Sequence, residues 1–336
     1  MVSLQDLPDE IILKVINYLQ IKDLIRCGDT SKRIRNISRD ESLWQKLNTS
    51  KLSGIFSTLN LKFQKHNLPI DFLKMVLENG CKYLHLESTV LCSPMELGNV
   101  TKDKMCLKKV SKLRCLDLKC CMASRDCFEE ILISCYSLQK LSITSGFFHV
   151  LFSQKMIESI CYQNSRTLKT LNLRGCKGLN LDSIQKITNN CKNLTNVDFS
   201  GTCLSEESIK FLARNLTFMV EKLNLGYLDA VTDDHVKILV KRCDKLKLLF
   251  LRRTPITSLT HIIENLEKTL EKLDVSCCFS LTYAMLINLQ AMPKLKVLNC
   301  SYCYSSDQEL LKKKMPTLSF KEISVDEEEF SYYSSN

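Results

Sequence analysis

One pattern of apolar residues recurs along most of the chain and limits what it can fold into. An apolar residue is followed by a second three positions later and by a third two positions after that, and this triplet occurs ten times. Successive central residues are 24 to 32 positions apart, and they are Leu59, Leu84, Leu116, Leu141, Leu171, Val197, Leu223, Leu249, Leu273 and Leu298. This period predicts a stack of similar units, because one such unit cannot bury its apolar side alone.

Each unit has a strand-like half and a helix-like half. At Leu171-Asn172-Leu173 the apolar residues alternate, which predicts a short strand. Between the triplets the apolar spacing becomes helical, as at Ile209, Leu212, Ala213 and Leu216. The sequence therefore predicts an α/β fold, a leucine-rich-repeat horseshoe solenoid over residues 51–321. About ten parallel strands should line its concave face, and helices should cover its convex face.

The 18 cysteines follow the repeat. Cys121, Cys176, Cys278 and Cys303 each lie five residues after a central apolar residue. The pair Cys300 and Cys303 has zinc-ligand spacing, but Cys300 stands where most other repeats have Leu, Ile or Val. We therefore interpret the cysteines as buried thiols and expect no metal and no cofactor. The pattern resembles the cysteine-containing class of leucine-rich repeats.

The charge is unevenly distributed along the chain. The 336 residues carry a net charge of +10, residues 51–321 carry +14, and the acidic tail, residues 322–336, has five acids and no Lys or Arg. We expect the basic middle to be a solvated, lysine-rich surface, and we favour this over nucleic-acid binding. No apolar stretch approaches the roughly 18–20 residues of a membrane span, and the start lacks the features of a signal peptide. A cytoplasmic or nuclear protein without a membrane partner is the expectation.

The first fifty residues do not follow the repeat. Apolar residues at helical spacing, Ile12, Val15, Ile16 and Leu19, predict a first helix. Ser31 can cap a second helix, and Asp40 can cap a third, which contains Leu43, Trp44 and Leu47. This region contains the run Leu7-Pro8-Asp9-Glu10-Ile11-Ile12, followed by Ile16, Tyr18-Leu19, Asp23-Leu24, Ser31-Lys32-Arg33 and Leu43-Trp44. With these residues at this spacing, the region resembles an F-box. An F-box at residues 1–50 before cysteine-type repeats is the arrangement of the F-box/leucine-rich-repeat family. The alternative is a helical cap that only shields the first repeat.

The resemblance to this family implies a function and partners. It implies a substrate-recognition adaptor of a Skp–cullin–F-box ubiquitin ligase, whose F-box docks a Skp-type adaptor and through it a cullin–RING ligase. The residues that it assigns to adaptor binding are Leu7, Pro8, Glu10, Ile11, Ile12, Ile16, Leu19 and Leu24. The sequence has no Gly-rich phosphate loop, zinc-protease motif or nucleophile elbow, so we expect a non-catalytic subunit.

The protein target should bind the concave face of the repeats. Residues that alternate with the inward leucines point to that face, and the predicted target-binding residues are Arg174, Asn224, Phe250 and Arg252. An exposed Phe250 beside two arginines would have the composition of a binding hot spot. The alternative is that Phe250 packs under the acidic tail, which could also cover the basic concave face. Two long intervals, with insertions at residues 88–109 and 145–155, are competing surfaces.

Two other functions remain open at this stage. One is a ligase-independent scaffold, in which the repeats tether a protein partner and the first fifty residues are only a cap. The other is a basic solenoid that binds nucleic acid. Retention of a Skp-type adaptor during purification would distinguish the ligase function from the scaffold. A steep salt dependence of binding to nucleic acid would indicate the basic solenoid.

Overall fold

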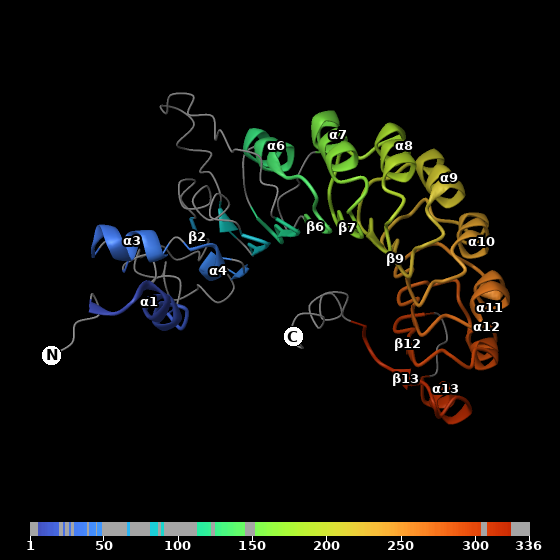
Figure 1. Ribbon diagram of the computed structural model, residues 1–336. Coiled ribbons are helices and arrows are strands. Elements are labelled where there is room, and N and C mark those ends of the chain that lie inside the picture. The colour runs from blue at the N-terminus through green and yellow to red at the C-terminus, as the bar shows by residue number, and fades with distance from the viewer. Residues whose placement is uncertain are drawn as a thin grey trace. The chain divides into compact units, whose positions relative to one another are not determined.

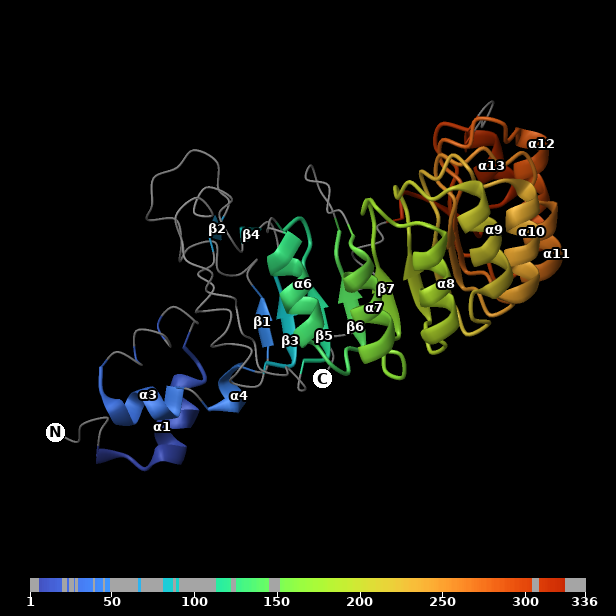
Figure 2. The same ribbon diagram turned by 90° about the horizontal axis from the view of Figure 1, so that it is seen from above.

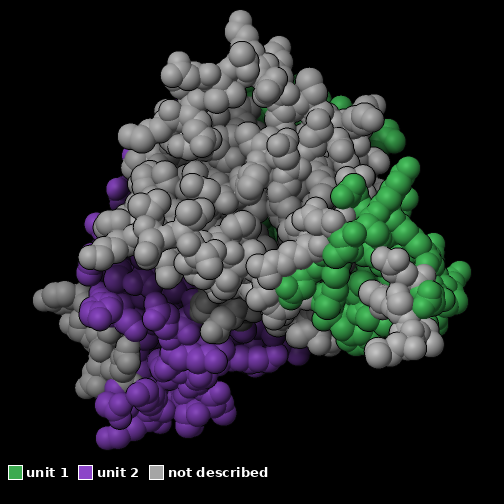
Figure 3. Space-filling view, turned by 90° about the vertical axis from the view of Figure 1, so that its left-hand side faces the viewer, with its two compact units in different colours: residues 1–168 green, residues 169–336 purple. Residues whose placement is uncertain are grey.

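The computed structural model describes most of the repeats and part of the N-terminal region (Figure 1). The described residues are 6–19, 23, 27, 30–38, 40–44, 46–48, 66–67, 81–86, 89–90, 113–121, 125–144, 152–303 and 308–323. The chain divides into two compact units, residues 1–168 and 169–336 (Figure 3). Within the described ranges, no helix has the length and apolar character needed to span a membrane.

Unit 1 contains a parallel sheet and the N-terminal helices. The strands β1 (Lys46–Asn48), β3 (Tyr83–His85), β5 (Cys115–Asp117) and β6 (Lys140–Ser142) pair in that order. Two short strands, β2 (His66–Asn67) and β4 (Thr89–Val90), pair with each other. The helices are α1 (Asp9–Ile16), α3 (Lys32–Ser38), α4 (Glu41–Trp44), α6 (Arg125–Ser134) and α7 (Gln154–Gln163).

Unit 2 is the more regular of the two. Its parallel strands, in sheet order, are β7 (Thr170–Asn172), β8 (Asn196–Asp198), β9 (Lys222–Asn224), β10 (Leu248–Phe250), β11 (Lys272–Asp274), β12 (Val297–Asn299) and β13 (Ser319–Phe320). Central residues of the repeat lie opposite one another, as Leu249 does to Leu223 and Leu273. The helices are α8 (Leu181–Asn190), α9 (Glu206–Asn215), α10 (Asp233–Arg242), α11 (Thr260–Leu266), α12 (Tyr283–Leu286), the 3-10 helix η4 (Ile287–Ala291) and α13 (Gln308–Lys314).

The helices of unit 2 cover one side of its sheet. Figures 1 and 2 show α8 to α11 next to one another along the outer side of the strands. We call the opposite side of this sheet the inner face. The strand–helix alternation follows the predicted α/β repeat, so the fold class is confirmed for the described repeats.

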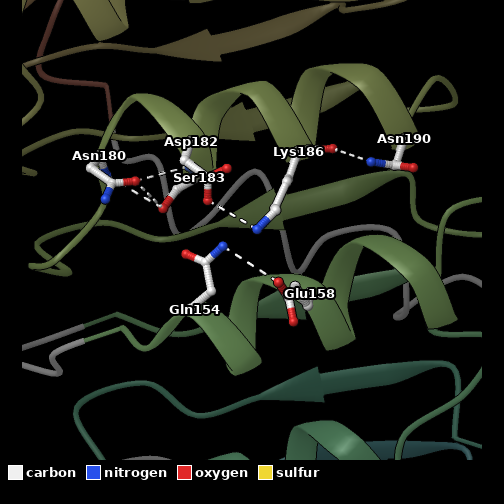
Figure 4. Close-up of polar contacts among 7 residues, drawn as sticks. All are labelled: Gln154, Glu158, Asn180, Asp182, Ser183, Lys186 and Asn190. Atoms are coloured by element: carbon white, nitrogen blue, oxygen red, sulfur yellow. Dashed lines mark hydrogen bonds and ion pairs between the residues drawn. The ribbon is translucent and has the colours of Figure 1, made fainter.

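Local contacts explain where the helices begin, and α8 is the clearest example (Figure 4). The side chain of Asn180 accepts the backbone N–H of Ser183 at 3.0 Å, and Ser183 Oγ accepts the backbone N–H of Asn180 at 3.4 Å. One turn later, Lys186 Nζ lies 3.0 Å from Asp182 Oδ2. The cap satisfies backbone donors that a helix start leaves open, so α8 begins at Leu181.

The inward residues of the repeat form the core. Every predicted central residue except Leu59, which lies outside the described residues, is buried. The helical apolar residues pack against these strands, and Ile209, Leu212, Ala213 and Leu216 of the repeat that contains α9 are all buried. Burial of one such side chain contributes roughly 1.5–3 kcal/mol, and neighbouring repeats supply most of the contact.

The strand next to β3 comes from the region that was expected to be wholly helical. The predicted first triplet, centred on Leu59, lies outside the described residues, and the place beside β3 is taken by β1, with Leu47 opposite Leu84. The prediction that Leu47 lies in a helix is therefore wrong, since α4 ends at Trp44. An added strand pairs backbone groups that would otherwise be open at the edge of β3.

At the other end of the chain, the sheet continues for one strand beyond the ten that were predicted. Strand β13 pairs in parallel with β12 and places Phe320 opposite Leu298. The sequence around Phe320 lacks the leucine triplet, which is why the repeat pattern did not predict this strand.

Candidate functional site

Helix α1 has an apolar surface on each of two sides. On one side Ile12 and Ile16 are fully buried, and α1 packs against α3, whose Ile34 and Ile37 are also buried. On the other side a stripe of apolar residues is exposed to solvent, and we call it the α1 stripe. It consists of Ile11 and Val15 on α1 and of Tyr18 and Leu19 directly after the helix.

Hydrogen bonds fix the segment that leads into α1. Arg33 Nη2 donates to Asp9 Oδ1 at 2.6 Å and to the carbonyl oxygen of Leu7 at 2.7 Å. Ser31 Oγ accepts the backbone N–H of Ile34 and thus caps α3. These contacts hold the exposed Pro8 at the start of α1.

The second predicted cap is also present. Asp40 Oδ1 accepts the backbone N–H of Ser42 at 2.9 Å and its hydroxyl at 2.6 Å, at the start of α4. These two hydrogen bonds stabilise the carboxylate and lower the pKa of Asp40. The predictions for Ser31 and Asp40 are therefore confirmed.

The structure divides the residues predicted for adaptor binding. Pro8, Glu10, Ile11 and Leu19 are exposed, and Leu7 is half-buried. Ile12 and Ile16 are core residues, so a partner cannot reach them without separating α1 from α3. Leu24 lies outside the described residues. The sequence pattern missed Val15 and Tyr18 as surface residues, although Ile11 and Val15 are four positions apart and thus share one helix face.

On the inner face of unit 2, polar side chains bond to one another across strands. Asn224 Nδ2 donates to Asp198 Oδ2, and Asn299 Nδ2 donates to Asp274 Oδ2, both at 3.0 Å. All four residues are buried, although their position in the repeat predicted exposure. Adjacent strands lie about 4.8 Å apart, so short side chains in register cover each other. Burial raises the pKa of Asp198, and the contacts with Ser200, Arg174 and Asn224 oppose this in part.

Strand β10 interrupts this polar series with an apolar cluster. Phe250 is only 5% exposed and packs with Leu248, Val297 and Ile323. The predicted exposure of Phe250 is therefore wrong, and the alternative, an aromatic packed under the start of the acidic tail, is confirmed. Figure 1 shows the described residues after β13 on the side of the strands away from the helices.

Arg252 lies directly beside this cluster. Its Nη1 is 3.1 Å from Glu322 Oε1, and its guanidinium lies 5.7 Å from the centre of the Tyr227 ring. Burial lowers the pKa of Arg252, but the Glu322 hydrogen bond, Tyr227 and Asp274 outweigh burial and raise it. We call Arg252, Leu248, Phe250 and Val297 the Arg252 site.

Lysines surround the Arg252 site. Lys222 and Lys272 lie opposite Leu248 on the two neighbouring strands. Burial lowers the pKa of Lys272, and the positive charges of Lys321 and Lys222 lower it further. An apolar centre with a basic surround favours an acidic partner that also carries apolar side chains.

The turns after β5 and after β7 to β12 each place one residue in the left-handed region of φ, and after β5 this residue is Cys120. In two repeats this residue is glycine, Gly175 and Gly201. In later repeats it is Tyr227, Arg253, Cys277 and Tyr302, with φ between 53° and 61°. A side chain in this conformation costs roughly 1–2 kcal/mol, so the later turns present large side chains at a cost to stability.

Several described cysteines are buried thiols held by the repeat. Cys121, Cys278 and Cys303 each donate a weak hydrogen bond to a carbonyl of the preceding repeat, at 3.0–3.1 Å from the oxygen. Burial raises the pKa of Cys135 and Cys243 to about 12, so these thiols are not nucleophiles at neutral pH. In the described part of the chain, no three His, Cys, Asp or Glu residues are grouped as metal ligands.

Only part of the predicted target-binding set comes together. Phe250 and Arg252 share the Arg252 site, whereas the exposed Arg174 lies next to Asp198 and Asn224 belongs to the polar series. The pattern missed Leu248, Val297 and Ile323. A signal was available for Leu248 and Val297, because their position in the repeat holds Thr170, Asn196, Lys222 and Lys272 in other units.

Comparison with known proteins adds two matches along the chain. A family model described as "SKP2 LRR domain" matches residues 71–332, and one described as "F-box-like" matches residues 4–50. Among solved structures, an internalin (inlF) from Listeria monocytogenes is similar over 82% of this chain and 94% of that chain, at 14% identity and a TM-score of 0.42.

Proposed function

The chain belongs to the SKP2 LRR domain family and carries an F-box-like region before its repeats, and from this premise we propose that it is a substrate receptor of a Skp–cullin–F-box ubiquitin ligase. In this function the F-box binds a Skp-type adaptor and the repeats bind a protein target. We place this activity in the cytoplasm or nucleus, where such a ligase operates.

The observation that carries the proposal is the α1 stripe. Two apolar side chains are exposed on one side of α1 and two more directly after it, whereas the other side of the helix is already packed. An exposed apolar surface of this kind marks a protein-binding surface, and a cap that only shielded a repeat would have no use for it. The capping alternative accounts for Ile12 and Ile16 but not for Ile11, Val15 and Tyr18.

The chain itself contributes position and no reactive group. A receptor of this kind holds the target's lysine near a charged ubiquitin carrier, so that the transfer becomes effectively intramolecular. Burial raises the pKa of Cys135 and Cys243 to about 12, so these two thiols take no part as nucleophiles in this function.

The proposal is tested by charge substitution on the α1 stripe. Ile11→Glu and Val15→Glu place a charge on the exposed side and should reduce capture of a purified Skp-type adaptor at least a hundredfold, while the melting curve stays unchanged. Lys14→Glu is the matched control, because Lys14 is exposed on the same helix but outside the stripe. Full capture by both stripe variants would support the ligase-independent scaffold.

The start of α1 gives a second test. Leu7→Ala combined with Pro8→Ala should weaken adaptor capture and leave the repeats folded, because neither side chain belongs to the core of the repeats. A decrease with this pair but not with Lys14→Glu would assign the start of α1 to the same surface as the stripe. Unchanged capture would remove Leu7 and Pro8 from that surface.

A further inference from the structure

Two residues of this chain occupy the inner face of unit 2 in the manner of a ligand. Ile323 is buried against Leu248, Phe250 and Val297, and the preceding Glu322 forms an ion pair with Arg252. We call Glu322–Ile323 the internal segment. It combines one carboxylate and one aliphatic side chain in consecutive positions. The Arg252 site supplies the complementary pair, a guanidinium beside an apolar cluster.

The internal segment uses the Arg252 site incompletely. The Glu322 side chain is 77% exposed, and its described contact with Arg252 involves Nη1 alone. Arg252 Nε is buried and has no hydrogen-bond partner among the described residues. A guanidinium binds a carboxylate best through two parallel N–H bonds, so a second carboxylate that reached both nitrogens would bind better than Glu322 does.

The charges around the site select the same kind of ligand. Lys222, Lys272 and Lys321 are close enough to one another to lower the pKa of Lys272. The acids of this face, Asp198 and Asp274, are buried and hydrogen-bonded to neighbouring asparagines. A ligand that brings negative charge is therefore attracted to this basic surround, and an aliphatic side chain next to that charge can contact the apolar cluster.

We propose that the Arg252 site binds a target protein through a linear segment in which an acidic residue directly precedes an aliphatic one, and that Glu322–Ile323 is an internal copy of this segment which the target displaces. The inference rests on the proposed function in one respect, namely that the repeats are the target-binding part. It does not depend on the adaptor or on the ligase.

A peptide added to the full chain tests the proposal without knowledge of the target. The probe is a capped, fluorescent peptide with the sequence of residues 321–325, Lys-Glu-Ile-Ser-Val. The released variant combines Glu322→Lys with Ile323→Ser. In this variant the internal segment no longer has the carboxylate and the aliphatic side chain that contact the Arg252 site. The peptide should bind this variant at least tenfold more tightly than it binds the parent, a difference of about 1.4 kcal/mol.

Two matched controls separate specific binding from general attraction to a basic surface. Replacing the peptide's Glu by Lys, or its Ile by Ser, should each reduce binding to the released variant at least tenfold. Adding Arg252→Glu to the released variant should reverse the charge preference, so that the Lys peptide binds better than the Glu peptide. If Arg252 had only a structural role, Arg252→Glu would reduce the affinity for both peptides equally.

Equal affinity of the parent and the released variant, or equal affinity for the Glu and Lys peptides, would overturn the proposal. Because Ile323→Ser removes a buried side chain close to β13, Glu322→Lys alone is the second variant, and the exposed position of residue 322 leaves the fold unaffected. Adaptor capture by the same variants should equal that of the parent. Loss of peptide binding with normal adaptor capture would therefore reject this inference alone, and the opposite result would reject the ligase function alone.

Discussion

Strands β8 and β9 and the neighbouring strand β10 belong to one parallel sheet but carry different inner faces. On β8 and β9, Asp198 and Asn224 bond to each other across the strands. On β10 the same position holds Phe250, which needs Ile323 as an apolar cover.

The difference shows how a repeat protein obtains a binding site. A polar series that satisfies its own hydrogen bonds leaves little for a ligand to gain. An apolar cluster beside a guanidinium with an unused N–H group gives a ligand more binding free energy. The ligand removes apolar surface from water and completes the ion pair. We therefore expect binding at β10, and the polar pairs on β8–β9 and on β11–β12 support it from both sides.

The largest expected effect concerns what both regions share, the buried central leucines. Leu171→Asp and Leu249→Asp should each lower the free energy of unfolding by at least about 4 kcal/mol, because a buried carboxylate has no partner there. Thermal melts with Lys169→Asp, at an exposed position next to β7, provide the control. A normal melt of Leu171→Asp would contradict the register of the sheet.

The next effect should distinguish the two inner faces. Phe250→Ala should cost about 3 kcal/mol, since it opens a cavity under Ile323, whereas Asn224→Ala should cost about 1–2 kcal/mol through its lost hydrogen bonds. Chemical denaturation of both variants measures the difference. Equal costs would mean that the apolar cluster adds no more to the fold than the polar pair does.

A smaller effect is expected at the turns. Tyr227→Gly relieves a left-handed side chain but increases the freedom of the unfolded chain, so stability should change by less than about 1 kcal/mol. Gly201→Ala, the reverse change, should cost about 1 kcal/mol, because φ is +64° there while an added Cβ would make only ordinary van der Waals contact with Gly175. A large loss in Tyr227→Gly would show that Tyr227 stabilises the fold and is not placed there for binding.

The smallest effect is a pH dependence at the start of α10. Helices α8 and α9 have Ser183 and Ser208 at their third position, whereas α10 has the buried His235, whose Nδ1 accepts the backbone N–H of Thr232 at 3.2 Å. Burial lowers the pKa of His235 below its usual 6.5, although Glu206 and Asp234 oppose this. The unfolded chain thus binds a proton more readily, and stability should fall as the pH drops below about 6.5.

The matched variant for this prediction is His235→Ser, which copies α8 and α9. Its stability should vary less between pH 7.5 and pH 5.5 than that of the parent, as measured by chemical denaturation at each pH. An identical pH dependence in both proteins would mean that His235 is protonated in the fold without penalty.

The repeat could be predicted from the sequence because its signal is local and recurs. Burial at the central leucines depends only on alternation within one strand, which any single repeat displays. The Arg252 site could not be predicted in the same way, because Ile323 reaches Phe250 from a distant part of the chain. The exposure of Asn224 was misjudged for a related reason, since its partner Asp198 lies on another strand and the pattern of one strand does not include its neighbour.

The pairing of β1 with β3 has a consequence for any attempt to separate the two modules. A chain cut at residue 51 would lose Lys46–Asn48 and leave the backbone N–H and C=O groups of Tyr83–His85 unpaired on that side. An open strand edge is a template for association with other chains. A repeat fragment that begins at residue 51 should therefore self-associate, whereas one that begins at Asp40 should keep its own edge strand and stay monomeric.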